Sequence, residues 1–256
     1  MQLKSIDGLG LEAAEHEASA SVSAGTVLLV HGITADLNEG EMFARLADQL
    51  SAQRRVLRFS FRGHGGSGGT QEGMTIAGEM LDLQSAVSLA LDRREPPLDI
   101  VASSFGAVST CLSLPYIEDH LRRLVLWNPV LNLTRTFTQP ELPWGRFNFG
   151  HKGQASLATN GYLLIDDEFR LGRVCWQEMH VYDPYAALMR SNLPALIIHG
   201  DADQSVPYDV SKQAASERRR CELVTILGSD HGFDDAPTEQ KAIDATVHWL
   251  ESDRPE

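Results

Sequence analysis

The sequence predicts an α/β fold with a mostly parallel, twisted β-sheet, helices on both faces of that sheet and an inserted cap. Short β-rich runs alternate along the chain with amphipathic helical patterns, which is typical of strand–helix–strand units. Several of these runs are apolar nearly throughout, as expected of strands that are covered on both faces. One long segment, rich in aromatic residues, interrupts the alternation.

Six runs rich in branched aliphatic residues are the predicted strands of the sheet, and each ends near a cluster of polar or glycine residues. They cover residues 26–30, 55–59, 98–102, 124–127, 195–199 and 223–227.

Three helices are expected between and after these strands, because apolar residues recur there with a helical period. The first carries apolar residues from Phe43 to Leu50, with Asn38 as the expected N-cap. The second begins near Thr75, and the last follows Asp235, which suits the start of a helix. Helices placed in this way cover a parallel sheet on both faces.

Residues 129–192 form the interruption, and residues 1–128 and 193–256 form the predicted core. A long insertion with many aromatic side chains is hard to reconcile with disorder. We therefore expect a cap over one edge of the sheet, with most of its rings forming the small core of the cap itself. Its aromatic residues are Phe137, Trp144, Phe147, Phe149, Tyr162, Phe169, Trp176, Tyr182 and Tyr185.

The composition excludes several classes of partner. The 256 residues carry a net charge of -13 at pH 7, and such a surface repels nucleic-acid phosphates and anionic lipids. The apolar runs are far shorter than the ~20 residues of a membrane helix, and the N-terminal residues do not resemble a secretory signal. We expect a cytoplasmic protein with no nucleic-acid or membrane partner. The oligomeric state stays open, with a homodimer as one alternative.

The cysteines and histidines do not form a metal-binding pattern. Cys111, Cys175 and Cys221 are widely separated, with no CxxC spacing. No HxxxH or HExxH string occurs. We therefore expect neither a metal ion nor a cofactor.

Residues 102–106 predict a sharp strand-to-helix turn that carries a nucleophilic serine, with the pattern small-x-Ser-x-Gly. A serine on such a turn needs small neighbours two residues before and after it, because those positions crowd against adjacent strands. Ser104 has Ala102 and Gly106 there, whereas Ser103 would have two large side chains. Ser104 is therefore the candidate nucleophile.

A general base and an acid for this serine follow two later predicted strands. Serine is a poor nucleophile until a base removes its proton, and an acceptor must hold that base in one tautomer. Asp203 follows the strand at 195–199, and His231 follows the strand at 223–227. Open parallel sheets place their sites at these strand ends. Asp201 is a rival acid, whose alternative role is to brace its loop.

With these motifs the sequence resembles the α/β-hydrolase superfamily over nearly the whole chain, because the order Ser104, Asp203, His231 is that of this fold. It is most similar to serine aminopeptidase-like and cinnamoyl (feruloyl) esterase-like serine hydrolases, although Ala102 replaces the usual first glycine of the turn. Three further motifs carry the resemblance: His31-Gly-Ile-Thr34, residues 61–68, and His199-Gly-x-x-Asp203-x-x-Val206-Pro207.

The resemblance implies an oxyanion hole formed by the backbone N–H groups of Ile33 and Phe105. It also implies an esterase that cleaves small or medium apolar or aromatic acyl esters through an acyl-enzyme intermediate. His31 is expected to fix the oxyanion loop, and His199 is expected to be a packing residue. The expected substrate-binding residues are Thr34, Trp144, Phe147, Phe149 and Trp176.

Other functions share the same residues. A thioesterase or a small peptidase uses the same three side chains, because the fold supplies the catalytic groups and the cap selects the substrate. A catalytically silent ligand-binding receptor on the same fold is the alternative from another class.

Overall fold

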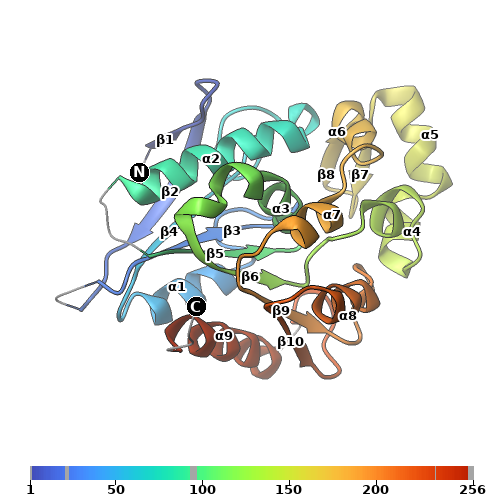
Figure 1. Ribbon diagram of the computed structural model, residues 1–256. Helices are drawn as coiled ribbons and strands as arrows, with labels where there is room; N and C mark the ends of the chain where they lie inside the picture. Colours follow the sequence, from blue (N-terminus) through green and yellow to red (C-terminus); the bar gives the residue numbers. More distant parts are fainter. Residues whose placement is uncertain (1, 21–22, 93–96, 234, 253–256) are drawn as a thin grey trace.

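The computed structural model describes residues 2–20, 23–92, 97–233 and 235–252 (Figure 1). Residues 1, 21–22, 93–96, 234 and 253–256 of the predicted core lie outside the described residues. The described part of the chain contains an eight-stranded sheet with the order β1-β2-β4-β3-β5-β6-β9-β10. Its strands are β1 Gln2–Lys4, β2 Gly10–His16, β3 Thr26–Val30, β4 Arg55–Phe59, β5 Leu98–Ser103, β6 Leu121–Trp127, β9 Ala195–Gly200 and β10 Cys221–Ile226.

The six strands expected from the sequence form the parallel part of this sheet, from β4 to β10. β1 and β2 add an antiparallel edge, because β1 pairs with β2 and β2 pairs with β4. These two strands were not predicted from the sequence. β2 contains two alanines and three charged or imidazole side chains in seven residues, so it lacks the β-branched composition that marks the other strands.

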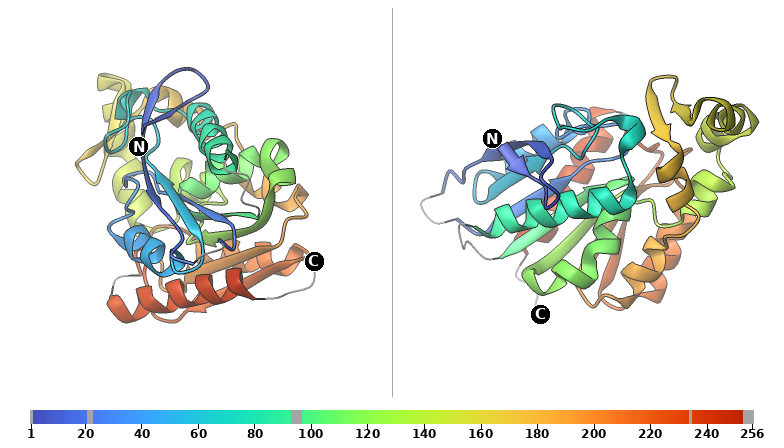
Figure 2. Two further views of the ribbon diagram at one scale, coloured as in Figure 1. Left: turned by 90° about the vertical axis from the view of Figure 1, so that its left-hand side faces the viewer. Right: turned by 90° about the horizontal axis from the view of Figure 1, so that it is seen from above.

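Helices cover both faces of the sheet, as expected (Figures 1 and 2). On one face, strand residues such as Leu28 and Ile100 pack against α2, α3, α7 and α8. On the other face, Val27 and Val101 pack against α1 and α9. The helices are α1 Met42–Leu50, α2 Ile76–Leu91, α3 Gly106–Ile117, α7 Pro184–Arg190, α8 Tyr208–Glu217 and α9 Ala236–Glu251. The predicted fold class is confirmed.

The helix starts agree with the sequence at two of three positions. The Thr75 side chain accepts a hydrogen bond from the backbone N–H of Gly78, and Asp235 caps α9 in a reciprocal capping box with Thr238. The prediction that Asn38 is the N-cap of α1 was wrong. Glu41 occupies that position with a φ of 69°, and its side chain makes no capping bond. Asn38 instead lies in the turn of residues 37–41, which precedes the helix.

The insertion, residues 129–192, connects two neighbouring strands of the sheet. It follows β6 and precedes β9, and these two strands pair directly with each other. Its last helix, α7, packs with the core through Ala187 and Leu188. Most of its other apolar residues pack in a third apolar cluster, which also contains Ile33 and Phe105 beside the turn after β5. Before α7, the insertion contains a π-helical turn Thr134–Thr138, α4 Pro143–Phe149, α5 His151–Asn160, the antiparallel hairpin β7 Tyr162–Ile165 and β8 Phe169–Gly172, and α6 Arg173–Glu178.

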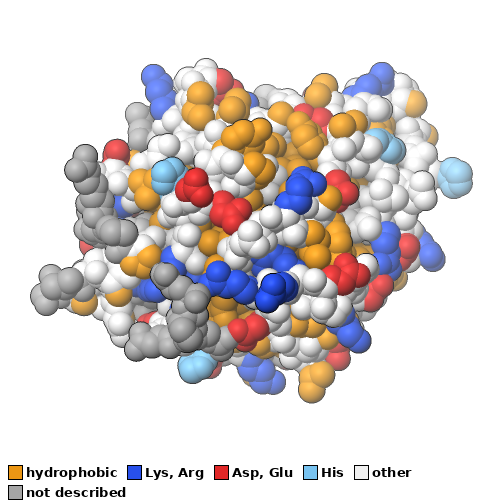
Figure 3. All heavy atoms as spheres, in the orientation of Figure 1, with side chains coloured by type: hydrophobic (Ala, Val, Ile, Leu, Met, Phe, Trp, Pro, Cys, Tyr) orange, Lys and Arg blue, Asp and Glu red, His pale blue; other side chains and the backbone are white. Residues whose placement is uncertain are grey.

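On the face shown in Figure 3, acidic and basic side chains are interspersed among apolar ones. Within the described residues, no helix is both long enough and apolar enough to cross a membrane.

Candidate active site

Ser104 lies on the tight turn between β5 and α3, with a φ of 48°. Residues other than glycine rarely adopt this left-handed conformation. The turn depends on Gly106, where a Cβ atom would lie 2.4 Å from the carbonyl oxygen of His31 and 2.7 Å from that of Val30. Ala102, at the other small position, is completely buried in β5. The steric requirement inferred from the sequence is therefore visible in the packing of this turn.

Ser104, His231 and Asp203 form one continuous series of hydrogen bonds. The Ser104 hydroxyl donates to Nε2 of His231 at 2.9 Å, and Nδ1 of His231 donates to Oδ2 of Asp203 at 2.7 Å. Both contacts are satisfied by the tautomer that carries its proton on Nδ1, since an ionised carboxylate only accepts. The structure thus brings together the three side chains that the sequence analysis singled out.

The loops that carry these residues follow β5, β9 and β10, and Asn128 at the end of β6 connects two of them. Its side-chain oxygen accepts a hydrogen bond from the N–H of Gly200 at 2.9 Å, and its amide nitrogen donates to the carbonyl oxygen of His231. Asn128 has a φ of 41°. The sequence analysis missed this residue, although an asparagine directly after an apolar strand is a signal for such a role.

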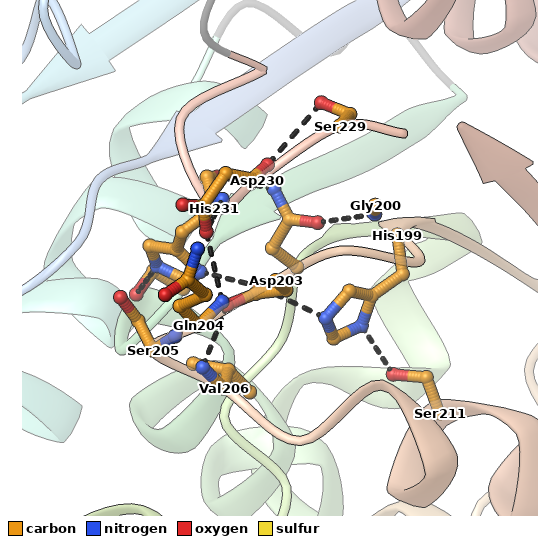
Figure 4. Close-up of polar contacts among 12 residues, drawn as sticks. His199, Gly200, Asp203, Gln204, Ser205, Val206, Ser211, Ser229, Asp230 and His231 are labelled. Carbon is orange, nitrogen blue, oxygen red and sulfur yellow. Dashed lines mark hydrogen bonds and ion pairs between the residues drawn. The ribbon is translucent and has the colours of Figure 1, made fainter. Parts of the chain in front are cut away.

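Asp203 is buried and receives donors on both carboxylate oxygens. The backbone N–H groups of Ser205 and Val206 each lie 2.8 Å from Oδ1, while two imidazoles share Oδ2 (Figure 4). Burial by itself would raise the pKa of Asp203. The charge of His231 and the hydrogen bonds from both imidazoles outweigh burial and hold the pKa well below its usual range. Asp203 is therefore ionised and fixed in orientation.

The second imidazole belongs to His199, which was expected from the sequence to be a packing residue. Its Nε2 lies 3.0 Å from Oδ2 of Asp203, and its Nδ1 lies 2.8 Å from the hydroxyl of Ser211. The ring is completely buried. His199 is therefore part of the polar network of the site. Asp201, the rival acid, instead accepts a hydrogen bond from the N–H of Gly228 at 2.6 Å and braces the loop before His231.

The surroundings of His231 favour its protonated form. Burial lowers the pKa of the imidazole. The opposite effect is larger, because the charge and hydrogen bond of Asp203 and the charges of Glu39 and Asp230 raise the pKa above its usual 6.5. The side chain is 26% exposed, which leaves Nε2 accessible next to Ser104. His231 can therefore hold a proton that arrives from the serine.

The backbone N–H groups of Ile33 and Phe105 lie on the loops that flank Ser104. Within the described part of the chain, neither donates a hydrogen bond to another protein group. Two buried histidines hold the loop of Ile33. His31 accepts from the N–H of Phe61 at 2.9 Å, and its Nδ1 lies 2.7 Å from the carbonyl oxygen of Gly32. The Nε2 atom of His64 lies 2.6 Å from the carbonyl oxygen of Ile33.

Burial and the nearby His64 lower the pKa of His31 to about 3. His31 is therefore neutral at ordinary pH. A neutral ring with its proton on Nδ1 fits both of its contacts, so His31 fixes the loop as expected.

A pocket of about 130 Å³ opens beside Ser104 and His231. Thr34 and Trp144 line it, whereas three other expected substrate-binding residues do not. Phe147 is 62% exposed, and Phe149 and Trp176 are buried in the insertion, where their rings stack 5.9 Å apart. The full lining is Gly32, Ile33, Thr34, Ala35, Glu39, Ser104, Val130, Thr136, Phe137, Trp144, Asp166, Ser205, Val206 and His231.

Asp166 brings a carboxylate to this pocket from the tip of the β7–β8 hairpin, where its φ is 52°. It accepts hydrogen bonds from the indole N–H of Trp144 at 2.9 Å and from the side-chain amide of Asn148 at 3.1 Å. The sequence analysis did not single out Asp166, because the hairpin itself was not predicted.

Among the described residues, no group of three or more His, Cys, Asp or Glu side chains is arranged to hold a metal ion. Cys111 and Cys175 are buried, and burial raises the pKa of both thiols.

Comparison with known proteins agrees with this architecture. A family model described as the alpha/beta hydrolase family matches residues 27–248. A search of curated proteins finds no significant match. Among solved structures, Est1E from Butyrivibrio proteoclasticus with bound ferulic acid has a TM-score of 0.81 and 21% identity, over 98% of this chain and 100% of that one.

Two other solved structures are similar over nearly their full length. A putative hydrolase from Agrobacterium vitis S4 has a TM-score of 0.77 and 19% identity, over 98% of this chain and 97% of that one. An esterase from Exiguobacterium antarcticum has a TM-score of 0.70 and 16% identity, over 98% and 99%. At these identities the likeness establishes a shared fold.

Proposed function

Because the chain belongs to the α/β-hydrolase family, we propose that it is a serine hydrolase that cleaves carboxylic esters through an acyl-enzyme intermediate. The observation that carries this proposal is the hydrogen-bonded series from Ser104 through His231 to Asp203. A serine becomes a useful nucleophile when a base accepts its proton and a third group orients that base. In this proposal Ser104 is the nucleophile, His231 is the base and Asp203 is the group that orients the base.

In the first half-reaction, the Ser104 oxygen attacks the ester carbonyl carbon while Nε2 of His231 accepts the serine proton. Asp203 keeps the imidazole in the required tautomer and stabilises the imidazolium that forms. His231 then gives the proton to the departing alkoxide, which leaves as an alcohol and leaves the acyl group on Ser104. In the second half-reaction, a water molecule gives its proton to His231 and attacks the acyl-enzyme, releasing the acid and restoring Ser104.

The negative oxygen of each tetrahedral intermediate needs preorganised donors. The N–H groups of Ile33 and Phe105 are suited to this role, because they flank the serine and lack a protein acceptor within the described residues. Donors of this kind contribute about 3 kcal/mol each to lowering the barrier.

The pocket favours a small acyl group. A volume of about 130 Å³ is well below the ~300–1,000 Å³ of pockets that enclose drug-sized ligands. The insertion supplies Val130, Thr136, Phe137, Trp144 and Asp166 to the lining. We therefore assign residues 129–192 as the cap and residues 1–128 and 193–256 as the core, with Thr34 and Trp144 retained as substrate-binding residues.

The test combines a fluorophosphonate probe with a panel of substrates. We expect the wild-type protein to be labelled and to hydrolyse p-nitrophenyl acetate faster than p-nitrophenyl octanoate or methyl ferulate. Ser104→Ala should abolish labelling and lower kcat by about 10⁴-fold or more. Ser88→Ala, which changes an exposed serine on α2, should behave like the wild type.

Each alternative predicts a different result. A preference for acyl thioesters or aminoacyl anilides over esters, by kcat/KM, would identify a thioesterase or a small peptidase. A folded wild-type protein that neither reacts with the probe nor turns over any substrate would indicate a ligand-binding receptor. Hydrolysis that survives in Ser104→Ala would show that the nucleophile is wrong.

A further inference from the structure

A second buried carboxylate, Glu39, lies at the candidate site and has no part in the mechanism above. Glu39 precedes α1 in a tight turn, with a φ of 47°, and only 9% of the residue is exposed. Glu39 lines the same pocket as Ser104 and His231. The sequence analysis did not single it out, because a glutamate beside a helix start reads as a solvated residue.

The two oxygens of Glu39 bind two different loops. The N–H of Gly32 donates to Oε2 at 2.6 Å, and the hydroxyl of Ser103 donates to Oε1 at 3.0 Å. Gly32 immediately precedes Ile33, and Ser103 immediately precedes Ser104. One carboxylate therefore connects the loop after β3 to the turn after β5.

These are the two loops that carry the N–H groups of Ile33 and Phe105. β3 and β5 pair in parallel only as far as Val30 and Ala102. Beyond that pair, sheet hydrogen bonds no longer set the distance between the loops. The Glu39 carboxylate spans this gap. It binds Gly32, one residue before Ile33, and Ser103, one residue before Ser104.

A buried carboxylate is costly unless it is paired and hydrogen-bonded. Burial raises the pKa of Glu39, while the hydrogen bonds from Gly32 and Ser103 and the charge of His231 oppose that rise. A protonated His231 therefore favours the ionised form of Glu39. The reverse also holds, because the Glu39 charge raises the pKa of His231.

The groups that face His231 come from several elements. Asp203 lies on the loop after β9 and is itself bonded to His199 on β9, Asp230 precedes His231 on its own loop, and Glu39 precedes α1. Of these, Glu39 alone also contacts the loop of Ile33 and the turn of Ser104.

We propose that Glu39 is a positioning residue of the site, which fixes the Gly32–Ile33 peptide relative to the Ser104 turn and adds its charge to those of Asp203 and Asp230 around His231. The inference rests on the proposed hydrolase function. It assigns Glu39 no contact with the reacting atoms.

The decisive variant is Glu39→Gln, which keeps the size of the side chain and removes its charge. An amide can accept a hydrogen bond with only one of its two ends, so one of the two loop contacts is lost. We expect kcat to fall by about 10- to 100-fold with a small change in KM, because misplaced catalytic groups cost rates of this order. The acid limb of kcat/KM should move to lower pH by about one unit, because His231 loses a negative neighbour.

Glu41→Gln is the matched control, since Glu41 lies two residues away and is exposed. Its rate and its pH profile should equal those of the wild type. A Glu39→Gln protein with the wild-type kcat, or with an unshifted acid limb, would overturn the proposal.

A second variant decides the matter if Glu39→Gln does not fold. Ser103→Ala keeps the charge and removes one of the two donors, so kcat should fall several-fold while the pH profile stays near that of the wild type. An unchanged kcat would overturn the bridging role. Failure of the wild-type protein to react with a fluorophosphonate would instead overturn the proposed function, so the two failures are distinguishable.

Discussion

His199 Nε2 lies 3.0 Å from Oδ2 of Asp203, the same oxygen that binds Nδ1 of His231. The carboxylate is ionised and accepts only, so Nε2 of His199 donates to it, while Nδ1 lies 2.8 Å from the hydroxyl of Ser211. Asp203 is thus oriented by His199, which lies four residues before it in the sequence. This arrangement predicts that His199 matters for both stability and rate.

We expect His199→Ala to lower kcat/KM by about tenfold, since a hydrogen bond to a charged group contributes about 1.5–3 kcal/mol. The Tm should fall as well, because the ring is completely buried. Ser211→Ala, which leaves the bond to Asp203 in place, should have a smaller effect on kcat/KM. Equal rates for His199→Ala and the wild type would show that the backbone donors alone suffice to orient Asp203.

The pH dependence of the wild-type protein follows from the environment of His231. The imidazole must be unprotonated to accept the serine proton, and its pKa is raised above 6.5 in the folded protein. Activity should therefore rise with pH, with the acid limb of kcat/KM centred above 6.5. Initial rates with p-nitrophenyl acetate from pH 5 to 9 at constant ionic strength provide the measurement. A limb centred below 6.5 would contradict the balance of charges described for this residue.

Trp144 is expected to limit the length of the acyl group. Its ring lines the pocket and is held by the bond from its indole N–H to Asp166. Trp144→Ala should enlarge the pocket and raise kcat/KM for p-nitrophenyl octanoate relative to the acetate by about tenfold.

Phe147→Ala is the comparison, because Phe147 is 62% exposed and lies outside the pocket lining. The ratio of the two esters should be unchanged in this variant. A changed ratio in Phe147→Ala would restore the substrate-binding role that the sequence suggested for it.

Glu79, which is not one of the proposed catalytic groups, should make the free energy of unfolding depend on pH. It is buried in α2, and the hydroxyl of Ser109 donates to its carboxylate. Burial raises the pKa of Glu79 from 4.5 to about 8. Between these values the unfolded chain releases its proton while the folded protein retains it, so stability falls as the pH rises through this window.

Glu79→Gln removes this titration. As the pH rises from 5 to 8.5, the free energy of unfolding of the variant should rise by about 1–3 kcal/mol relative to that of the wild type. Urea unfolding at pH 5 and at pH 8.5 provides the measurement. Glu41→Gln, at an exposed carboxylate, should show no such gain. Parallel pH dependence for Glu79→Gln and the wild type would show that the buried carboxyl does not titrate in this range.

The sheet core was predictable from the sequence because its strands are buried on both faces. The runs at 26–30 and 55–59 agree with β3 and β4 at both ends. β6 begins three residues earlier than predicted, at Leu121, because two arginines in its first half hide the apolar pattern. One of them, Arg123, is buried and donates to the carbonyl oxygen of Trp249 on α9. A tertiary contact thus completes a strand that its local sequence does not mark.

The site was predictable to the extent that its residues follow a local motif. Ser104, Asp203 and His231 each follow a recognisable strand, so their convergence could be expected. Glu39 and Asn128 act through side chains that cross between loops distant in the sequence. No local pattern marks the contacts of Glu39, and the place of Asn128 after an apolar strand marks its position but not its partners. The hairpin that carries Asp166 has a turn of acidic residues in place of asparagine and glycine.

The direct pairing of β6 with β9 has a consequence for how this molecule can change. Leu124 lies opposite Ala195 although the whole insertion joins the two strands. A different stretch could replace the part of the insertion between Asn128 and α7 without moving the register of the sheet or the loops that Asn128 connects. Substrate range could thus diversify by exchange of one contiguous block, while the chemistry is inherited intact.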